Sequence, residues 1–196
     1  MEQQSAHPST QLRVERQWGQ LLGTNIRTFD GDGRLVCFSQ AKAFKLKEDI
    51  AFFEDEAKTK PLFRVKARNV IDIAATYDMI ANDGQVFGSL RRKGLMSAFA
   101  QDHWFILDAA GNTVGEIMED SALLGVIRRF VDFAAYFLPQ KYTVRFGDQP
   151  VATIQQRRNP FTVKYDYVID SGVFGNYRQL FLAISALLAI IEARQN

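Results

Sequence analysis

The stretch LFLAISALLAII (residues 180–191) is apolar on every face of a helix, and Ser185 is its single polar residue. Arg178 and Gln179 precede it, and Glu192 and Arg194 follow it. Twelve helical residues extend about 18 Å, well short of the roughly 30 Å hydrocarbon core of a bilayer. A helix that is hydrophobic all round and too short to span a membrane is a buried helix. We therefore predict a core helix here, and no transmembrane segment.

One pattern recurs upstream of this stretch. It is a run of alternating apolar residues, a turn rich in Gly, Asp and Asn, and a second alternating run. The copies are NIRTFDGDGRLVCFSQ (25–40), YDMIANDGQVFGSLRRK (77–93), WFILDAAGNTVGEIMED (104–120) and YTVRFGDQPVATIQQRR (142–158). Period-two alternation around such turns predicts β-hairpins. Further alternating runs bring the total to roughly a dozen short strands.

Small residues share strand faces with large apolar residues in three of these hairpins: Gly88 with Leu90, Gly115 with Ile117, and Ala152 with Ile154. A face that lacks bulky side chains lets another element approach closely, and the axis of a closed barrel is the place to bury an apolar helix. We predict a mostly β fold: an antiparallel closed barrel of about twelve strands around the C-terminal helix. Leu90, Ile117 and Ile154 are expected to point at that helix.

The remaining segments complete the predicted organisation. Apolar residues recur at helical spacing over 121–137, which predicts an amphipathic helix capped by Asp120 or Ser121 and ended by Pro139. Residues 1–10 are polar and are predicted to be a disordered leader, which leaves 11–196 as a single domain. No targeting segment is visible at the N-terminus, which predicts a cytoplasmic protein.

Composition excludes several classes of protein. Lys and Arg number 24 against 22 Asp and Glu, a formal net charge of +2, which excludes a strongly cationic nucleic-acid binder. Cys37 is the single cysteine, so the chain has neither an intrachain disulfide nor a zinc site built from several cysteines.

The order of these elements resembles the tubby C-terminal-like fold, a twelve-stranded barrel around a hydrophobic C-terminal helix. This fold is shared by tubby proteins, phospholipid scramblases and plant LURP-one-related proteins. The likeness is carried by AKAFKLKEDIAFFEDEAKTKPLFRVKAR (41–68), YDMIANDGQVFGSLRRKG (77–94), WFILDAAGNTVGEI (104–117), KYTVRFGDQPVATIQQRRNPFTVKYDYVID (141–170) and the final helix. It is greatest to the LURP-one-related and scramblase-like branch.

This resemblance implies a non-enzymatic domain that binds anionic phospholipid head groups. Tubby-like domains bind phosphoinositide head groups through a basic surface site, and scramblases are described as calcium-dependent lipid movers. The scramblase calcium loop is rich in carboxylates, whereas residues 170–175 of this chain keep only Asp170. The turn Asp30-Gly-Asp32-Gly33 is no EF-hand, because Ala41 stands where the twelfth-position Glu is needed. We therefore predict no metal and no cofactor.

The sequence contains no nucleophile elbow, no zincin helix motif, no P-loop and no dinucleotide fingerprint. His103 stands alone at a predicted strand start, Cys37 is interpreted as a core residue, and Glu54-Asp55-Glu56 lies in a turn with two lysines. No set of nucleophile, base and orienting group can be named. We predict that the protein is not an enzyme.

Clusters of cations are the candidate binding residues. They are Arg91, Arg92, Lys93, Arg157 and Arg158, which end two equivalent hairpins, so that a barrel brings them to the same rim. Exposed Lys and Arg attract anionic lipid surfaces, which predicts a peripheral membrane protein. The same charges also suit an ordinary solvated surface. The alternative is therefore a protein-interaction or structural scaffold that binds a protein partner and no lipid.

Overall fold

The computed structural model describes residues 8–17, 24–41, 49–68, 75–93, 103–120, 140–158 and 162–191. These residues form twelve strands and a C-terminal helix, α2 (Ser171–Ile191). The strands are β1 (Ser9–Gln17), β2 (Thr24–Asp30), β3 (Leu35–Ala41), β4 (Ile50–Phe53), β5 (Pro61–Ala67), β6 (Thr76–Ala81), β7 (Val86–Arg92), β8 (His103–Leu107), β9 (Thr113–Glu119), β10 (Lys141–Phe146), β11 (Gln149–Arg158) and β12 (Thr162–Asp170). The predicted helix over 121–137 lies outside the described residues.

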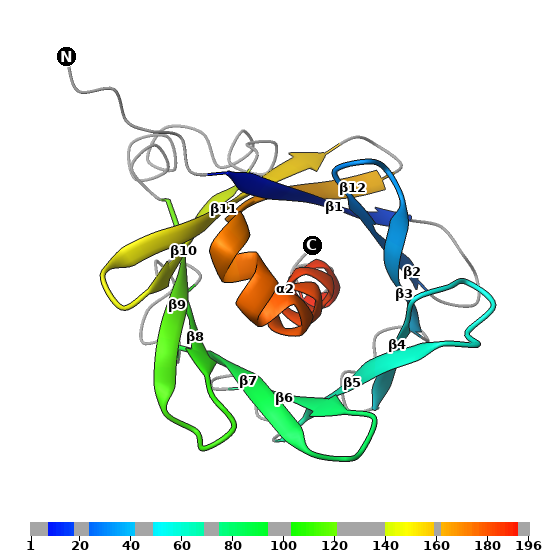
Figure 1. The fold of residues 1–196 in the computed structure, drawn as a ribbon, viewed down its shortest axis with the longest axis horizontal. Helices are drawn as coiled ribbons and strands as arrows, with labels where there is room; N and C mark the ends of the chain where they lie inside the picture. Colours follow the sequence, from blue (N-terminus) through cyan, green and yellow to red (C-terminus); the bar gives the residue numbers. More distant parts are fainter. Residues whose placement is uncertain are drawn as a thin grey trace, which may run out of the picture.

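The twelve strands form a single closed barrel. Each strand pairs antiparallel with its neighbours in sequence, and β1 closes the barrel by pairing with β12 over nine residue pairs, from Ser9 with Asp170 to Gln17 with Thr162. Figure 1 looks down the barrel and shows α2 inside the ring of strands. The predicted closed barrel around an apolar C-terminal helix is thus confirmed. Ser9 and Thr10, the last residues of the predicted leader, begin β1, and residues 1–7 lie outside the described part.

Local turn chemistry explains the predicted hairpins. Gly33, Gly84 and Gly111 have φ of 79°, 89° and 89°, a left-handed conformation that glycine adopts without a steric penalty. Side chains also fix the turns: Oδ1 of Asp30 accepts hydrogen bonds from the backbone N–H groups of Asp32 (3.0 Å) and Arg34 (2.9 Å).

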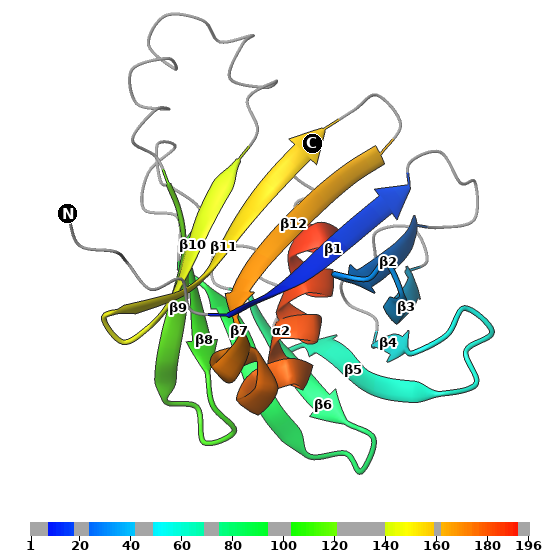
Figure 2. The ribbon, with the colours of Figure 1, turned by 45° about the horizontal axis from the view of Figure 1, so that its top comes forward.

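Helix α2 begins nine residues before the predicted start at Leu180. Oδ1 of Asp170 accepts a hydrogen bond from the backbone N–H of Val173 at 3.0 Å, so that Asp170 acts as the N-cap. The sequence pattern did not predict this start, because Gly172 and Gly175 in the first turns are poor helix formers. The backbone leaves helical geometry at Tyr177 (φ −124°, ψ 28°), and Figure 2 shows α2 as two segments at an angle.

The two segments of α2 have different surroundings. Residues 172 and 175–179 are exposed at one end of the barrel, whereas residues 180–190 are all buried inside it. The full helix is long and apolar enough to cross a membrane, and 61 % of the qualifying window is buried inside the barrel. A length of twelve residues was therefore the wrong reason for excluding a membrane span. The burial of the helix is the observation that argues for a core helix.

The inner face of the wall packs as predicted. Leu90, Ile117 and Ile154 are fully buried in the core cluster that contains α2. A Cβ added at Gly88 would lie 3.2 Å from Cδ1 of Leu180, so this glycine does allow the helix to approach.

Gly115 makes room for a different group. A Cβ there would lie 2.5 Å from both the carbonyl oxygen of Arg145 and the ring of Phe146. Phe146 in turn packs on Tyr177 and Phe181, with ring centroids 5.2 and 6.1 Å away. The small residue thus lets an aromatic side chain bridge the wall and the helix.

Candidate functional site

Among the described residues, charged side chains are distributed unevenly over the two ends of the barrel. We call the end that contains the five connections 31–34, 54–60, 82–85, 108–112 and 147–148 the hairpin rim. These connections hold seven carboxylates and three cations. We call the opposite end the basic rim, defined by the three residues of each strand nearest to it. They include eight cations and three carboxylates. In the described part of a chain whose net charge is only +2, cations thus predominate in the strand ends of one rim and carboxylates in the connections of the other.

Two adjacent arginines of β7 point to opposite sides of the wall. Leu90 faces the core, and alternation along the strand places Arg91 outside and Arg92 inside. The guanidinium of Arg91 lies 5.5 Å from the ring centroid of Phe105, and that of Arg92 lies 5.5 Å from that of Trp104. The predicted run Arg91-Arg92-Lys93 is thus no single exposed cluster, because Arg92 is directed into the barrel.

The structure does place the two predicted groups at the same rim, because β7 and β11 run in the same direction. Three strands separate them in the barrel, which corresponds to about 19 Å along the wall at 4.8 Å per strand. Lys93 is exposed, and Arg157 is exposed and pairs with Asp166. Arg158 ends β11, and its side chain lies outside the described part. The described residues of the two groups therefore lie apart along the rim.

Charged side chains on the outer face of β11, β12 and β1 form a network of ion pairs that the sequence interpretation missed. Glu15, Lys164 and Arg157 are register neighbours across the three strands, and Arg13 pairs with Asp166 in the next row. Oε1 of Glu15 lies 2.8 Å from Nζ of Lys164 and 3.4 Å from Nε of Arg13. A groove of about 460 Å³ lies over this network and is lined by Arg13, Lys164 and Arg157, among others. Only the pairing of β1 with β12 brings these residues together.

The inner side of the basic rim is polar and buried. Arg16 is 3 % exposed, and Glu119 and Gln156 are also buried. Burial lowers the pKa of the Arg16 guanidinium from its usual value, and the nearby Tyr165 acts in the opposite direction. Nε2 of Gln156 donates a hydrogen bond to the hydroxyl of Tyr165 at 2.9 Å. Because α2 follows β12 at the hairpin rim and runs through the barrel, its C-terminal end, where cations are favourable, is directed towards the basic rim.

The residues considered for catalysis have structural partners. Nε2 of His103 lies 2.9 Å from Oε2 of Glu116. Burial raises the pKa of the Cys37 thiol to about 12, so that it is not a thiolate at neutral pH. Glu56 pairs with Arg27 at 2.7 Å, and Asp55 accepts hydrogen bonds from its own turn. Among the described residues, no three His, Cys, Asp or Glu are grouped so that they could hold a metal ion.

A closed twelve-stranded antiparallel barrel with an apolar C-terminal helix inside defines a tubby-like domain, in this case one with a basic and an acidic end. The family model for LURP-one-related proteins matches residues 35–188. The chain belongs to the LURP-one-related family. Comparison with curated proteins and with solved structures finds no match.

Proposed function

We propose that this domain is a non-enzymatic, cytoplasmic module that binds the surface of anionic membranes peripherally through its basic rim. The observation that carries the proposal is the uneven distribution of charge in the described residues. The strand ends of the basic rim hold eight cations and three carboxylates, and the connections of the hairpin rim hold three cations and seven carboxylates. An anionic surface attracts the first end and repels the second. It therefore selects one orientation of the barrel.

The contact runs through exposed cations in the basic rim and directly beyond it. Arg91 lies near the end of β7, Lys93 directly follows that strand, and Arg157 lies near the end of β11. All three are exposed, and each cation near an anionic surface contributes about 1 kcal/mol. Arg92 is left out of this set because it faces the barrel interior.

A second candidate function, a scaffold for a protein partner, is favoured by the pairing of several cations in the basic rim or next to it. Arg68, which directly follows β5, contacts Asp78 at 2.6 Å. Lys164 contacts Glu15 at 2.8 Å, and Arg157 contacts Asp166. Pairing of this kind also stabilises an ordinary solvated surface. The two functions differ in whether anionic vesicles are bound.

Co-sedimentation with vesicles tests the proposal. Vesicles of phosphatidylcholine alone should not bind the protein, and vesicles of equal parts phosphatidylcholine and phosphatidylserine should. The binding should weaken with added salt, because exposed charges are screened over about 10 Å at 0.1 M.

Two triple variants supply matched loss of charge. Arg91→Gln with Lys93→Gln and Arg157→Gln should remove most of the binding. Arg34→Gln with Lys58→Gln and Lys60→Gln removes the three cations of the hairpin connections and should leave binding unchanged or stronger. If both triple variants lose vesicle binding equally, or if the parent protein does not bind the vesicles, the result contradicts the proposal and favours the scaffold.

A further inference from the structure

We infer that the groove on the outer face of β1, β12 and β11 binds a phosphomonoester group. This inference rests on the proposed function and adds to it a site of defined chemistry. The groove begins beside Asp30 at the hairpin rim and extends along β12 to Lys164 and Arg157 near the basic rim. The end of the groove at Lys164 and Arg157 therefore lies close to the surface that we propose faces the membrane.

Three cations from three neighbouring strands line the groove. Arg13 comes from β1, Lys164 from β12 and Arg157 from β11. Their side chains are 48, 36 and 72 % exposed, so that all three remain accessible to a ligand. Cross-strand neighbours on one face of a sheet are close enough for long side chains to meet. Three cations can thus approach one small anion from three sides.

The carboxylates of the groove are already engaged with the protein. Asp166 pairs with Arg157, and Oδ1 of Asp30 accepts two backbone hydrogen bonds in its own turn. Glu15 contacts both Arg13 and Lys164, but it is not among the residues that line the groove. The lining itself therefore has three cations and two carboxylates, and one carboxylate outside it orients two of the cations.

The number of cations selects the kind of phosphate. A phosphomonoester presents three terminal oxygens and up to two negative charges, whereas a phosphodiester presents two such oxygens and one charge. Arg and Lys both bind phosphate, and the planar guanidinium of Arg contacts two oxygens at once. The groove volume of about 460 Å³ lies within the range of small-ligand sites, so a phosphate and a few attached carbons fit. Val168, which is 44 % exposed, offers the apolar contact for those carbons.

Such a group has two sources, a lipid and a soluble ester, and the experiment separates them. The lipid arm uses phosphatidylcholine vesicles that contain either phosphatidate or phosphatidylserine, adjusted to equal vesicle charge. The soluble arm titrates glycerol 3-phosphate in a phosphate-free buffer and follows the amide signals of β1 and β12 by NMR. We expect phosphatidate vesicles to bind more tightly than phosphatidylserine vesicles of the same charge.

The groove variant is Arg13→Gln with Lys164→Gln, and its control is Lys58→Gln with Lys60→Gln in the connection 54–60. Both remove two positive charges, and the control leaves the cations of the basic rim and of the groove in place. The groove variant should lose the preference for phosphatidate, a loss of about tenfold for the removal of a charge-assisted contact. The control should keep that preference. Arg13→Lys with Lys164→Arg preserves both charges and should also retain it, which shows that the effect is not a loss of folding.

Each outcome separates the groove from the proposed function. Binding of glycerol 3-phosphate that depends on Arg13 and Lys164, without vesicle binding, supports the groove with a soluble ligand and overturns the membrane function. Vesicle binding with no preference for phosphatidate, and no response to glycerol 3-phosphate, overturns the groove and leaves the membrane function in place. Failure of both arms overturns both proposals.

Discussion

On the inner face of the barrel wall, Leu90 and Ile117 are fully buried, whereas the outer face of the same two strands carries the exposed Arg91 and the partly exposed Glu116. The two faces alternate residue by residue along each strand. Inner side chains are fixed by contact with α2 and with one another. Outer side chains are held by local ion pairs and cation–π contacts, such as that of Arg91 with Phe105.

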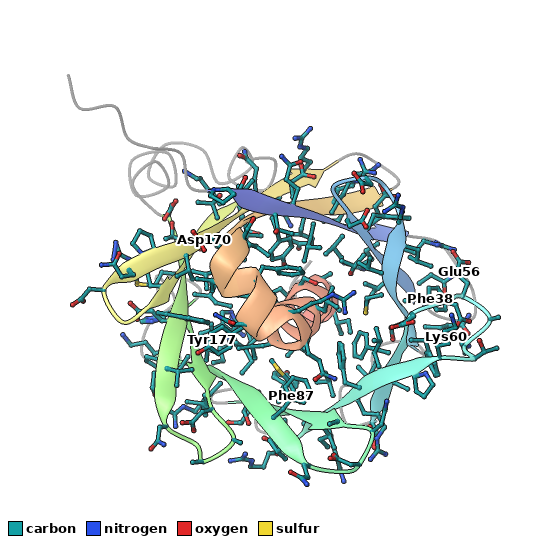
Figure 3. All side chains as sticks on the ribbon, in the orientation of Figure 1. Phe38, Glu56, Lys60, Phe87, Asp170 and Tyr177 are labelled. Atoms are coloured by element: carbon teal, nitrogen blue, oxygen red, sulfur yellow. The ribbon has the colours of Figure 1, made fainter. Side chains whose placement is uncertain are left out.

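This difference separates the determinants of folding from those of binding. Figure 3 shows Phe87 on the inner side of the ring of strands, and Glu56 and Lys60 outside it. A substitution on the inner face changes packing that the whole barrel shares. A substitution on the outer face changes one local contact, so the outer face can acquire a ligand without loss of the fold. The following predictions test that separation, from the largest expected effect on stability to the smallest.

Leu187→Asp should prevent folding. Leu187 is fully buried in the inner segment of α2, and an unpaired carboxylate there is destabilising by at least about 4 kcal/mol, comparable with the total stability of a domain. Asn176→Asp introduces the same group in the exposed segment of the same helix and should leave the protein folded. Circular dichroism and size-exclusion chromatography measure both. A folded Leu187→Asp protein would contradict the buried position of the helix.

Gly115→Ala should lower the free energy of unfolding by about 1–3 kcal/mol. The added Cβ would lie 2.5 Å from the backbone carbonyl oxygen of Arg145, which cannot move without disturbing the sheet. Gly175→Ala, in the exposed part of α2, meets nothing within 4 Å and should raise stability by about 0.5–1 kcal/mol. Urea denaturation of both variants measures the change. Effects of the same sign would refute the assignment of these glycines to opposite environments.

Arg92→Gln and Arg91→Gln compare the two faces at adjacent positions. Arg92 faces inward over Trp104, and its replacement should destabilise the protein by about 1 kcal/mol. Arg91 is exposed, and its replacement should change stability by less than about 0.5 kcal/mol while it weakens binding to anionic vesicles. Thermal denaturation and vesicle co-sedimentation give the two readouts. If Arg92→Gln weakened vesicle binding more than Arg91→Gln, the inward assignment of Arg92 would be wrong.

Acid should affect the hairpin turns only at low pH. The hydrogen bonds from Asn112 hold the pKa of Asp108 below its usual value, and those from Thr59 do the same for Asp55. A lowered pKa in the folded state contributes stability above the unfolded-state pKa of about 3.9. That contribution is lost as the pH falls through the folded-state value. Melting temperatures should therefore respond less to acid below about pH 4 in Asp108→Asn than in the parent protein, and should respond equally above about pH 5.

Local signals were sufficient for most of the barrel. The Gly-containing turns and the period-two alternation predicted the hairpins, and the pairing of small with large residues predicted the inward faces at Leu90, Ile117 and Ile154. The same alternation already placed Arg91 and Arg92 on opposite faces, since Leu90 faces inward. The sequence interpretation treated the basic run as one cluster and did not apply that rule.

Two features needed information that the local pattern lacks. The start of α2 depends on the cap by Asp170, and two glycines in the first turns conceal it. The groove depends on the pairing of β1 with β12, and contacts such as that between Thr10 and Ser171 join residues 161 positions apart. Pairing across such a separation is decided by closure of the barrel, which no short stretch of sequence encodes.

That closure has a consequence for synthesis of the chain. A ribosome makes Ser9 well before its partner Asp170, and all the strands between β1 and β12 are made in the interval. Until then the nascent sheet keeps two open edges, and open edges pair readily with other chains. The helix that fills the barrel is made after the last strand, so the lining of the wall stays uncovered throughout elongation. Truncated products that end before β12 should therefore aggregate, and chaperones that cover strand edges should associate with this protein mainly during translation.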